Sequence, residues 1–277
     1  MLEADSVTVR YGGRLAVDGV SLRIDRGTCV ALCGPNGAGK STLLAALAGE
    51  HPLGPDQVRV DGESISGMAP ASLALKRAVL EQSPSLTAAF SVTELISLSI
   101  PLAVSPTHTA QIVASALEAV DLAAFGDRHV SSLSGGQRHR AHLGRALAQL
   151  LGAQHLGELG CLMLDEPTAS LDIAHQIAVM RLCKHIAQEG GTVVVVLHDL
   201  NLAAAFADAV ALMHAGKLVS FGPPAKVFTE ARLEDVYGTP VSVTYDPSGR
   251  PTILPHYTSE KETLNVHRHE PVQSAAL

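Results

Sequence analysis

The sequence contains no tryptophan, and aromatic residues make up only 3% of its 277 residues. Proteins that bind single-stranded nucleic acid stack bases on aromatic side chains, so this composition argues against that class. The formal net charge of −7 argues in the same direction, because nucleic-acid-binding domains are expected to be basic. We therefore expect no nucleic acid among the partners of this chain.

Long hydrophobic runs are also missing. No stretch approaches the roughly 18 consecutive apolar residues of a transmembrane helix. The acidic start, Met1 to Asp5, is not followed by the apolar segment of a signal peptide. These absences predict a cytoplasmic protein that does not span a membrane, although it can contact a protein that does.

Cysteines are few: the four present are too scattered for a disulfide framework. Cys29 and Cys33 share one face of a short β-prone stretch, and Cys161 lies in another apolar run. We expect buried small hydrophobic side chains here, with a metal site as the less favoured alternative. Hydrophobic residues at 47% and charged residues at 17% indicate a globular chain with a sizeable core, in one large or two modest domains.

What the sequence does contain is a phosphate-binding pattern, G-x-x-x-x-G-K-[ST]. A β-prone stretch, 28–33, precedes it, and a helix-forming stretch, 43–48, follows it and stops at Gly49. A glycine-rich turn without function is the alternative, but a strand, glycine loop and helix are the arrangement that presents N–H groups to a phosphate. The pattern comprises Gly34, Pro35, Asn36, Gly37, Ala38, Gly39, Lys40, Ser41 and Thr42.

Other motifs follow along the chain. Strands are expected at 6–11, 20–24 and 58–60, then a helix at 71–77 and a strand at 78–81 that ends at Gln82. The next segment has helical spacing and begins with apolar residues that suit either a core or a docking patch: Leu86, Phe90 and Val92. Tyr11 suits either an ordinary strand end or a ring on which adenine stacks.

The second half of the chain carries two further motifs, one rich in glycine and one acidic. Leu133-Ser134-Gly135-Gly136-Gln137 opens a predicted helix at 138–151, with a loop at 152–160. An apolar strand at 161–166 ends in Asp165 and Glu166, where a carboxylate can reach the Mg²⁺ of a phosphate loop. A Val-rich strand at 192–197 is predicted to be interior and parallel, and it ends at His198. The expected remainder is a helix at 173–188, a helix at 200–207, strands at 210–214 and 217–221, and helices at 224–229 and 231–237.

Taken in order, these motifs resemble the ATP-binding subunits of ABC transporters over roughly residues 5–240, and Leu-Ser-Gly-Gly-Gln is nearly specific to them. The resemblance implies an α/β fold: a RecA-like phosphate-loop NTPase core (about 1–82 and 161–257), an antiparallel β subdomain and an α-helical subdomain (about 83–152). Residues 1–257 would form one ATPase domain and 258–277 a flexible polar tail, in which a haem or metal contact through its histidines is the alternative.

The resemblance also implies roles for individual residues. Residues 34–42 would wrap the phosphates of ATP, with adenine on Tyr11. Ser41, Gln82 and Asp165 would hold Mg²⁺. Glu166 would polarise the attacking water, and His198 would contact the γ-phosphate. Ser134, Gly135, Gly136 and Gln137 would complete the ATP site of a second copy in a head-to-tail homodimer, and Asp172 would contact that copy.

Three departures from the family pattern stand out. His139 occupies a position where the family usually has Gln, Ser-Leu-Asp at 170–172 replaces Ala-Leu-Asp, and the 152–160 link is longer than usual. None removes a catalytic group, so the expected activity is ATP hydrolysis coupled to transport.

The stretch Leu197 to Ala204 is similar to the importers of haem, iron-siderophores and cobalamin, and 172–176 with the 152–160 link looks most like the haem (hemin) subgroup. This implies two copies of a separate permease, an external substrate-binding protein, and a peripheral place on the cytoplasmic face of the bacterial inner membrane. The alternatives are siderophore or cobalamin import, a soluble ABC ATPase without a permease, and a non-catalytic binding module; the last would lack Lys40 or Glu166.

Overall fold

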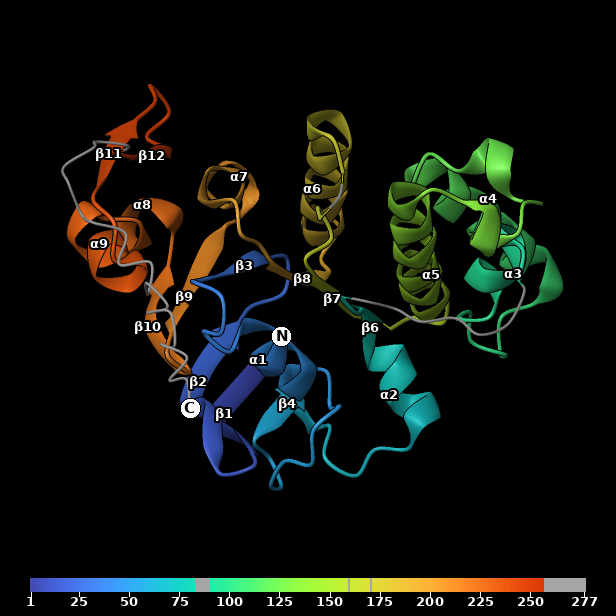
Figure 1. Cartoon of the computed structure of the whole chain (residues 1–277). Coiled ribbons are helices and arrows are strands. Elements are labelled where there is room, and N and C mark those ends of the chain that lie inside the picture. Colours follow the sequence, from blue (N-terminus) through green and yellow to red (C-terminus); the bar gives the residue numbers. More distant parts are fainter. Residues whose placement is uncertain (83–89, 159, 170, 257–277) are drawn as a thin grey trace, which may run out of the picture.

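A computed structural model of the chain describes residues 1–82, 90–158, 160–169 and 171–256. Its central sheet has the strand order β10–β9–β3–β8–β7–β6 (Figure 1). All neighbours are parallel except β10, which runs antiparallel to β9. The strands are β3 (Cys29–Cys33), β6 (Arg77–Leu80), β7 (Cys161–Asp165), β8 (Thr192–Val196), β9 (Ala209–His214) and β10 (Lys217–Gly222).

The Val-rich strand β8 lies between β3 and β7, and every one of its residues is buried. A parallel strand covered on both faces has no solvent side, which explains why its sequence shows no alternation. The prediction of an interior parallel strand is therefore confirmed.

A second, antiparallel sheet with order β2–β1–β4–β5 lies below the central one in Figure 1. Helix α1 (Lys40–Leu47) contacts β1, β7 and β8, so it lies between the two sheets, and its Leu43 and Leu47 are fully buried. The strands are β1 (Leu2–Tyr11), β2 (Arg14–Ile24), β4 (Val58–Val60) and β5 (Glu63–Ser64). The predicted α/β class with an antiparallel β subdomain is confirmed.

Helices α3 (Val92–Ser97), α4 (Pro106–Ala119) and α5 (Gly135–His155) gather beside the β6 edge of the central sheet, on the right of Figure 1. Two 3-10 turns accompany them, at Ala123–Phe125 and Val130–Ser132. Val92 is fully buried and Phe90 packs against the same core, so the structure favours the core interpretation for both. Leu86 lies outside the described residues.

Helix α5 is longer than predicted at both ends. It begins at Gly135 because Ser134 caps it: the Gln137 N–H donates to the Ser134 hydroxyl at 3.2 Å, and the Ser134 N–H donates to the Gln137 side chain at 3.0 Å. It continues to His155, so the loop predicted at 152–160 is shorter. Gly152 lies inside the helix, and Pro101 packs so closely on it that a Cβ there would lie 2.6 Å from the Pro101 ring.

The remaining helices are α2 (Pro70–Lys76), α6 (Ile173–Gln188), α7 (Leu200–Phe206), α8 (Pro224–Val227) and α9 (Glu230–Tyr237). A final hairpin, β11 (Val241–Tyr245) and β12 (Pro251–Pro255), was not predicted. It docks on α7 through Asn201, whose amide donates to the Ile253 carbonyl at 3.1 Å and accepts from its N–H at 2.7 Å. The polar tail from residue 258 lies outside the described residues.

All four cysteines are free and buried, as expected for structural thiols. Burial raises the pKa of the Cys29 and Cys33 thiols to about 12, which keeps both protonated. Among the described residues no cluster of three or more His, Cys, Asp or Glu side chains suits a metal ion. Within that same part of the chain, none of the helices combines the length and the apolar character that crossing a bilayer demands.

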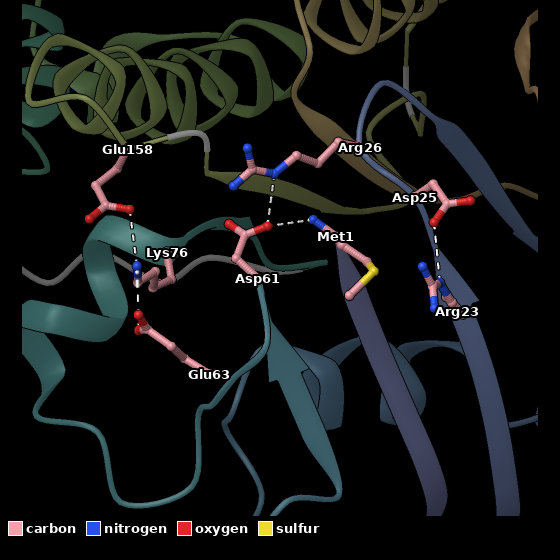
Figure 2. Close-up of polar contacts among 8 residues, drawn as sticks. All are labelled: Met1, Arg23, Asp25, Arg26, Asp61, Glu63, Lys76 and Glu158. Carbon is pink, nitrogen blue, oxygen red and sulfur yellow. Dashed lines mark hydrogen bonds and ion pairs between the residues drawn. The ribbon is translucent and has the colours of Figure 1, made fainter.

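A polar cluster joins the antiparallel sheet to the start of β3 (Figure 2). The Asp61 carboxylate accepts from the Met1 ammonium at 2.6 Å and from Arg26 Nε at 2.9 Å. Next to it, Lys76 lies between Glu158 at 3.0 Å and Glu63 at 3.5 Å, so it ties α2 to the segment that leads into β7.

Substitution of Asp61 by Asn should lower the free energy of unfolding by about 1 kcal/mol at neutral pH. Burial alone would raise the pKa of Asp61, but the bonds from Arg26 and the N-terminal ammonium outweigh it and hold the pKa below its ordinary value. A depressed pKa means that this stability is present above the unfolded pKa and is lost as the pH falls through the folded one. Urea unfolding over an acid pH series should show the two proteins converging.

Asp25→Asn is the matched control, because Asp25 pairs with Arg23 at the exposed surface and its side chain is 72% exposed. Its unfolding midpoint should stay close to that of the unsubstituted chain. A midpoint for Asp61→Asn that matched this control at neutral pH would show that the Asp61 cluster does not stabilise the fold.

Candidate active site

The register of the central sheet brings the chemistry-bearing loops together. Val196 at the end of β8 pairs with Leu32 of β3 on one side and with Asp165 of β7 on the other. Because parallel strands end at the same edge, the loop after β3, the acidic pair after β7 and His198 after β8 meet there. Leu80 of β6 pairs with Leu164, which brings Gln82 to the same edge.

Two glycines of the loop between β3 and α1 are required by geometry. Gly34 has φ +146° and a Cβ on it would lie 2.2 Å from the Met213 carbonyl oxygen. Gly39 has φ +98°, and its Cβ would lie 2.2 Å from the Ala16 carbonyl oxygen. The loop is therefore pressed against backbone on both sides, and only glycine fits at its two ends.

Lys40 opens helix α1, and its ammonium curls back over the loop. Nζ donates to the Gly34 carbonyl at 2.8 Å and to the Pro35 carbonyl at 3.0 Å. Burial lowers the pKa of Lys40, while the nearby carboxylates of Glu166 and Asp165 oppose that shift. An ammonium has three hydrogens, so one is free for an anion in the adjoining cavity.

Ser41 and Asp165 place two oxygen atoms side by side, and both are of the kind that can bind a metal ion. The Ser41 hydroxyl donates to Asp165 Oδ1 at 3.1 Å, and Asp165 is buried. Burial raises the pKa of Asp165, the Ser41 hydrogen bond lowers it, and the charge of Glu166 raises it again. A cation beside this carboxylate would relieve the cost of burying a negative charge.

Glu166 follows β7 directly and has a positive φ of +52°, uncommon for a residue with a side chain. Its Oε1 lies 2.6 Å from His198 Nε2. An imidazole N–H to carboxylate hydrogen bond of this length fixes the orientation of both groups. Strained backbone at such a position is typical of functional sites.

These groups surround one cavity of about 420 Å³. Its walls are Asn36, Gly37, Ala38, Gly39, Lys40, Ser41, Thr42, Gln82, Glu166 and His198. A second cavity of about 300 Å³ adjoins it and shares Ser41, Thr42 and Gln82. Tyr11 and Asp165 line the second cavity. Ten of the predicted site residues thus line one cavity, and Tyr11 lies next to it.

His51 was missed by sequence reasoning. Its Nε2 lies 3.0 Å from the Tyr11 hydroxyl, and the two rings meet edge to face with centroids 5.6 Å apart. His51 therefore holds Tyr11 in a defined orientation beside the second cavity. The contact links residues 40 positions apart, and no local pattern in the sequence points to it.

The predicted site residues at the start of α5, and Asp172 at the start of α6, lie outside both cavities. Neither cavity is lined by Ser134, Gly135, Gly136, Gln137 or Asp172. Ser134 and Gly135 are exposed at the helix N-terminus, and Asp172 caps α6 through the His175 N–H at 2.9 Å. These residues therefore do not contribute to either cavity of their own chain.

Comparison with known proteins places the chain in a large family. The family profile described as "ABC transporter" matches residues 17–169. The hemin import ATP-binding protein HmuV of Streptomyces coelicolor is 45% identical over 91% of this chain and 89% of its own length. The protein of the same name from Rhizobium meliloti is 41% identical over 92% of this chain and 98% of its own length.

Solved structures of ABC transporter proteins are also similar to this chain. A metal-chelate type ABC transporter in an inward-facing conformation is 26% identical, with a TM-score of 0.72 over 93% of this chain and 98% of that one. A dimeric ATP-binding cassette bound to ADP and Pi is 26% identical, with a TM-score of 0.70 over 81% of this chain and 99% of that one. The chain therefore belongs to the ATP-binding subunits of ABC transporters, which are ATPases that couple hydrolysis to transport.

Proposed function

We propose that the cavity of about 420 Å³ is the site of ATP hydrolysis. The observation that carries this proposal is that Lys40, Glu166 and His198 line one cavity together with the glycine loop. Phosphoryl transfer needs charge neutralisation and positioning rather than covalent catalysis. The cavity offers both: an ammonium and loop N–H groups for the phosphates, and a fixed carboxylate for the attacking water.

Mg²⁺ fits the donors present. Ser41 Oγ and Asp165 Oδ1 lie 3.1 Å apart, and Gln82 lines the same space. Hydroxyl, carboxylate and amide oxygens are ligands that Mg²⁺ accepts alongside phosphate and water. Bound there, the ion would supply positive charge to the β- and γ-phosphates.

Each residue of the site then has its own role in ATP hydrolysis. Lys40 stabilises the charge of the transferred phosphoryl group. Glu166 accepts a hydrogen bond from the attacking water and orients it, and His198, held 2.6 Å from Glu166, keeps that carboxylate in place and faces the γ-phosphate. The ring on Tyr11, steadied by His51, supports adenine in the adjoining cavity.

We further propose that a second copy completes each site. Ser134 and Gly135 stand at an exposed helix N-terminus, which suits a phosphate. In a head-to-tail dimer each copy would present Ser134 to Gln137 to the ATP of the other, with Asp172 near the contact. A dimeric cassette bound to ADP and Pi among the structural relatives supports the pairing of two copies.

The cargo we propose is hemin. The support comes from relatives named hemin import ATP-binding proteins, 45% and 41% identical over more than nine-tenths of this chain. Two copies of a separate permease and an external binding protein would carry hemin recognition, with this subunit peripheral on the cytoplasmic side of the inner membrane. Iron-siderophore or cobalamin is the alternative cargo, and the metal-chelate type transporter among the structural relatives is what keeps it open.

A cell that lacks this subunit should fail to grow on hemin as its only iron source and should use other iron sources normally. The reason is that transport through the permease stops without ATP hydrolysis, while other importers keep their own ATPases. Growth curves on hemin, ferric siderophore and cobalamin-dependent media check this, with a plasmid copy as the control. Normal growth on hemin with a defect on siderophore or cobalamin would assign the other cargo.

A further inference from the structure

Among the described residues, one hydrogen bond joins helix α5 directly to the segment that follows Glu166. His139, five residues after Ser134, places Nε2 3.0 Å from the Pro167 carbonyl oxygen. The ring is half-buried, and no other residue bonds to that carbonyl among the described contacts. A carbonyl oxygen can only accept, so Nε2 carries a proton and donates this bond. Burial lowers the pKa of His139, which favours the neutral form of the ring.

The next residue makes a second, indirect connection to the same segment. Arg140 Nη1 donates to Asp121 Oδ2 at 2.9 Å, and that carboxylate lies 3.7 Å from His175 Nε2. His175 Nδ1 in turn lies 2.8 Å from Asp172 Oδ1. Adjacent residues of α5 thus reach both ends of the segment between Glu166 and α6.

We infer that His139 is a positioning residue for hydrolysis, because it fixes the Pro167–Thr168 peptide, one residue beyond Glu166, against the helix that carries Ser134. Glu166 has the uncommon φ of +52°, and the residue that follows it is a proline, whose ring fixes its own φ. The bond to the Pro167 carbonyl therefore also restrains the peptide that joins Glu166 to Pro167. Since Ser134 would engage the ATP of the other copy, the same bond ties each catalytic carboxylate to the occupancy of the opposite site. This inference rests on the proposed composite site.

The test compares His139→Leu, which removes the donor, with His139→Gln, which can reach the same carbonyl with an amide N–H. His139→Leu should lower kcat about tenfold and leave KM for ATP within about twofold, as expected when a positioning contact is lost. His139→Gln should recover most of kcat. His155→Leu, the same change at an exposed position at the far end of α5, should keep the original kcat and KM.

A separate readout distinguishes this inference from the composite site itself. The double variant Glu166→Gln, His139→Leu should form the ATP-bound dimer at the same ATP concentration as the single variant Glu166→Gln, as measured by light scattering. If no dimer forms with intact His139, the composite site is wrong. If the dimer forms but His139→Leu retains full kcat, or lowers Tm and kcat alike without rescue by Gln, His139 does not position Glu166.

Discussion

Replacement of Glu166 by Gln should leave ATP binding intact and slow hydrolysis by about 10²–10⁴-fold. In the unsubstituted chain His198 Nε2 lies 2.6 Å from the Glu166 carboxylate. The amide of Gln keeps the shape of the side chain and can still bond to His198, so the site should stay assembled. What it loses is the negative charge that polarises the attacking water. Steady-state phosphate release and equilibrium binding of ATP measure the two effects separately.

The same variant should accumulate as an ATP-bound dimer, because closure no longer leads to hydrolysis and release. Light scattering with ATP and Mg²⁺, and with ADP as the control, checks this. Near-normal turnover would move the water-orienting role to another group. A monomer that binds ATP tightly would remove the support for closure around two nucleotides.

Lys40→Ala should weaken ATP binding by roughly 100-fold or more, since each charge-assisted hydrogen bond contributes about 1.5–3 kcal/mol. The Gly34 and Pro35 carbonyls also lose their donor, so the loop itself becomes less ordered. Isothermal titration with ATP measures the loss. Lys217→Ala is the control, because Lys217 pairs with Asp18 at the surface and its side chain is 68% exposed; ATP affinity equal to that control would exclude Lys40 from the phosphate site.

Much of the site was predictable because it depends on local spacing. The glycine loop, Ser41 and the acids at the end of a strand each follow from a few adjacent residues, and parallel strands bring their ends to one edge without further information. The neighbouring registers of β3, β8 and β7 explain why motifs more than a hundred residues apart in sequence meet at one cavity.

What the sequence did not predict depends on tertiary contacts. Helix α5 continues to His155, although Gly152 alone suggests a helix end. The glycine is explained instead by Pro101, which comes from another segment and leaves no room for a side chain there. The hairpin of β11 and β12 is held by Asn201, far away along the chain. The contacts of His51 with Tyr11 and of His139 with Pro167 likewise join separate segments, so no periodicity in the sequence marks them.

The measurement that tests the central claim most directly is the ATPase activity of a mixture of Lys40→Ala and Ser134→Arg chains. Ser134→Arg alone should still bind ATP as a monomer, because Ser134 does not line the cavity of its own chain. It should not hydrolyse ATP, because the arginine prevents each copy from completing the site of the other. In a mixed dimer one site combines an intact Lys40 with an intact Ser134, so random pairing should restore at most about a quarter of the original rate. Activity no higher than the sum of the separate variants, in a mixture shown by light scattering to pair, would contradict a site built from two copies.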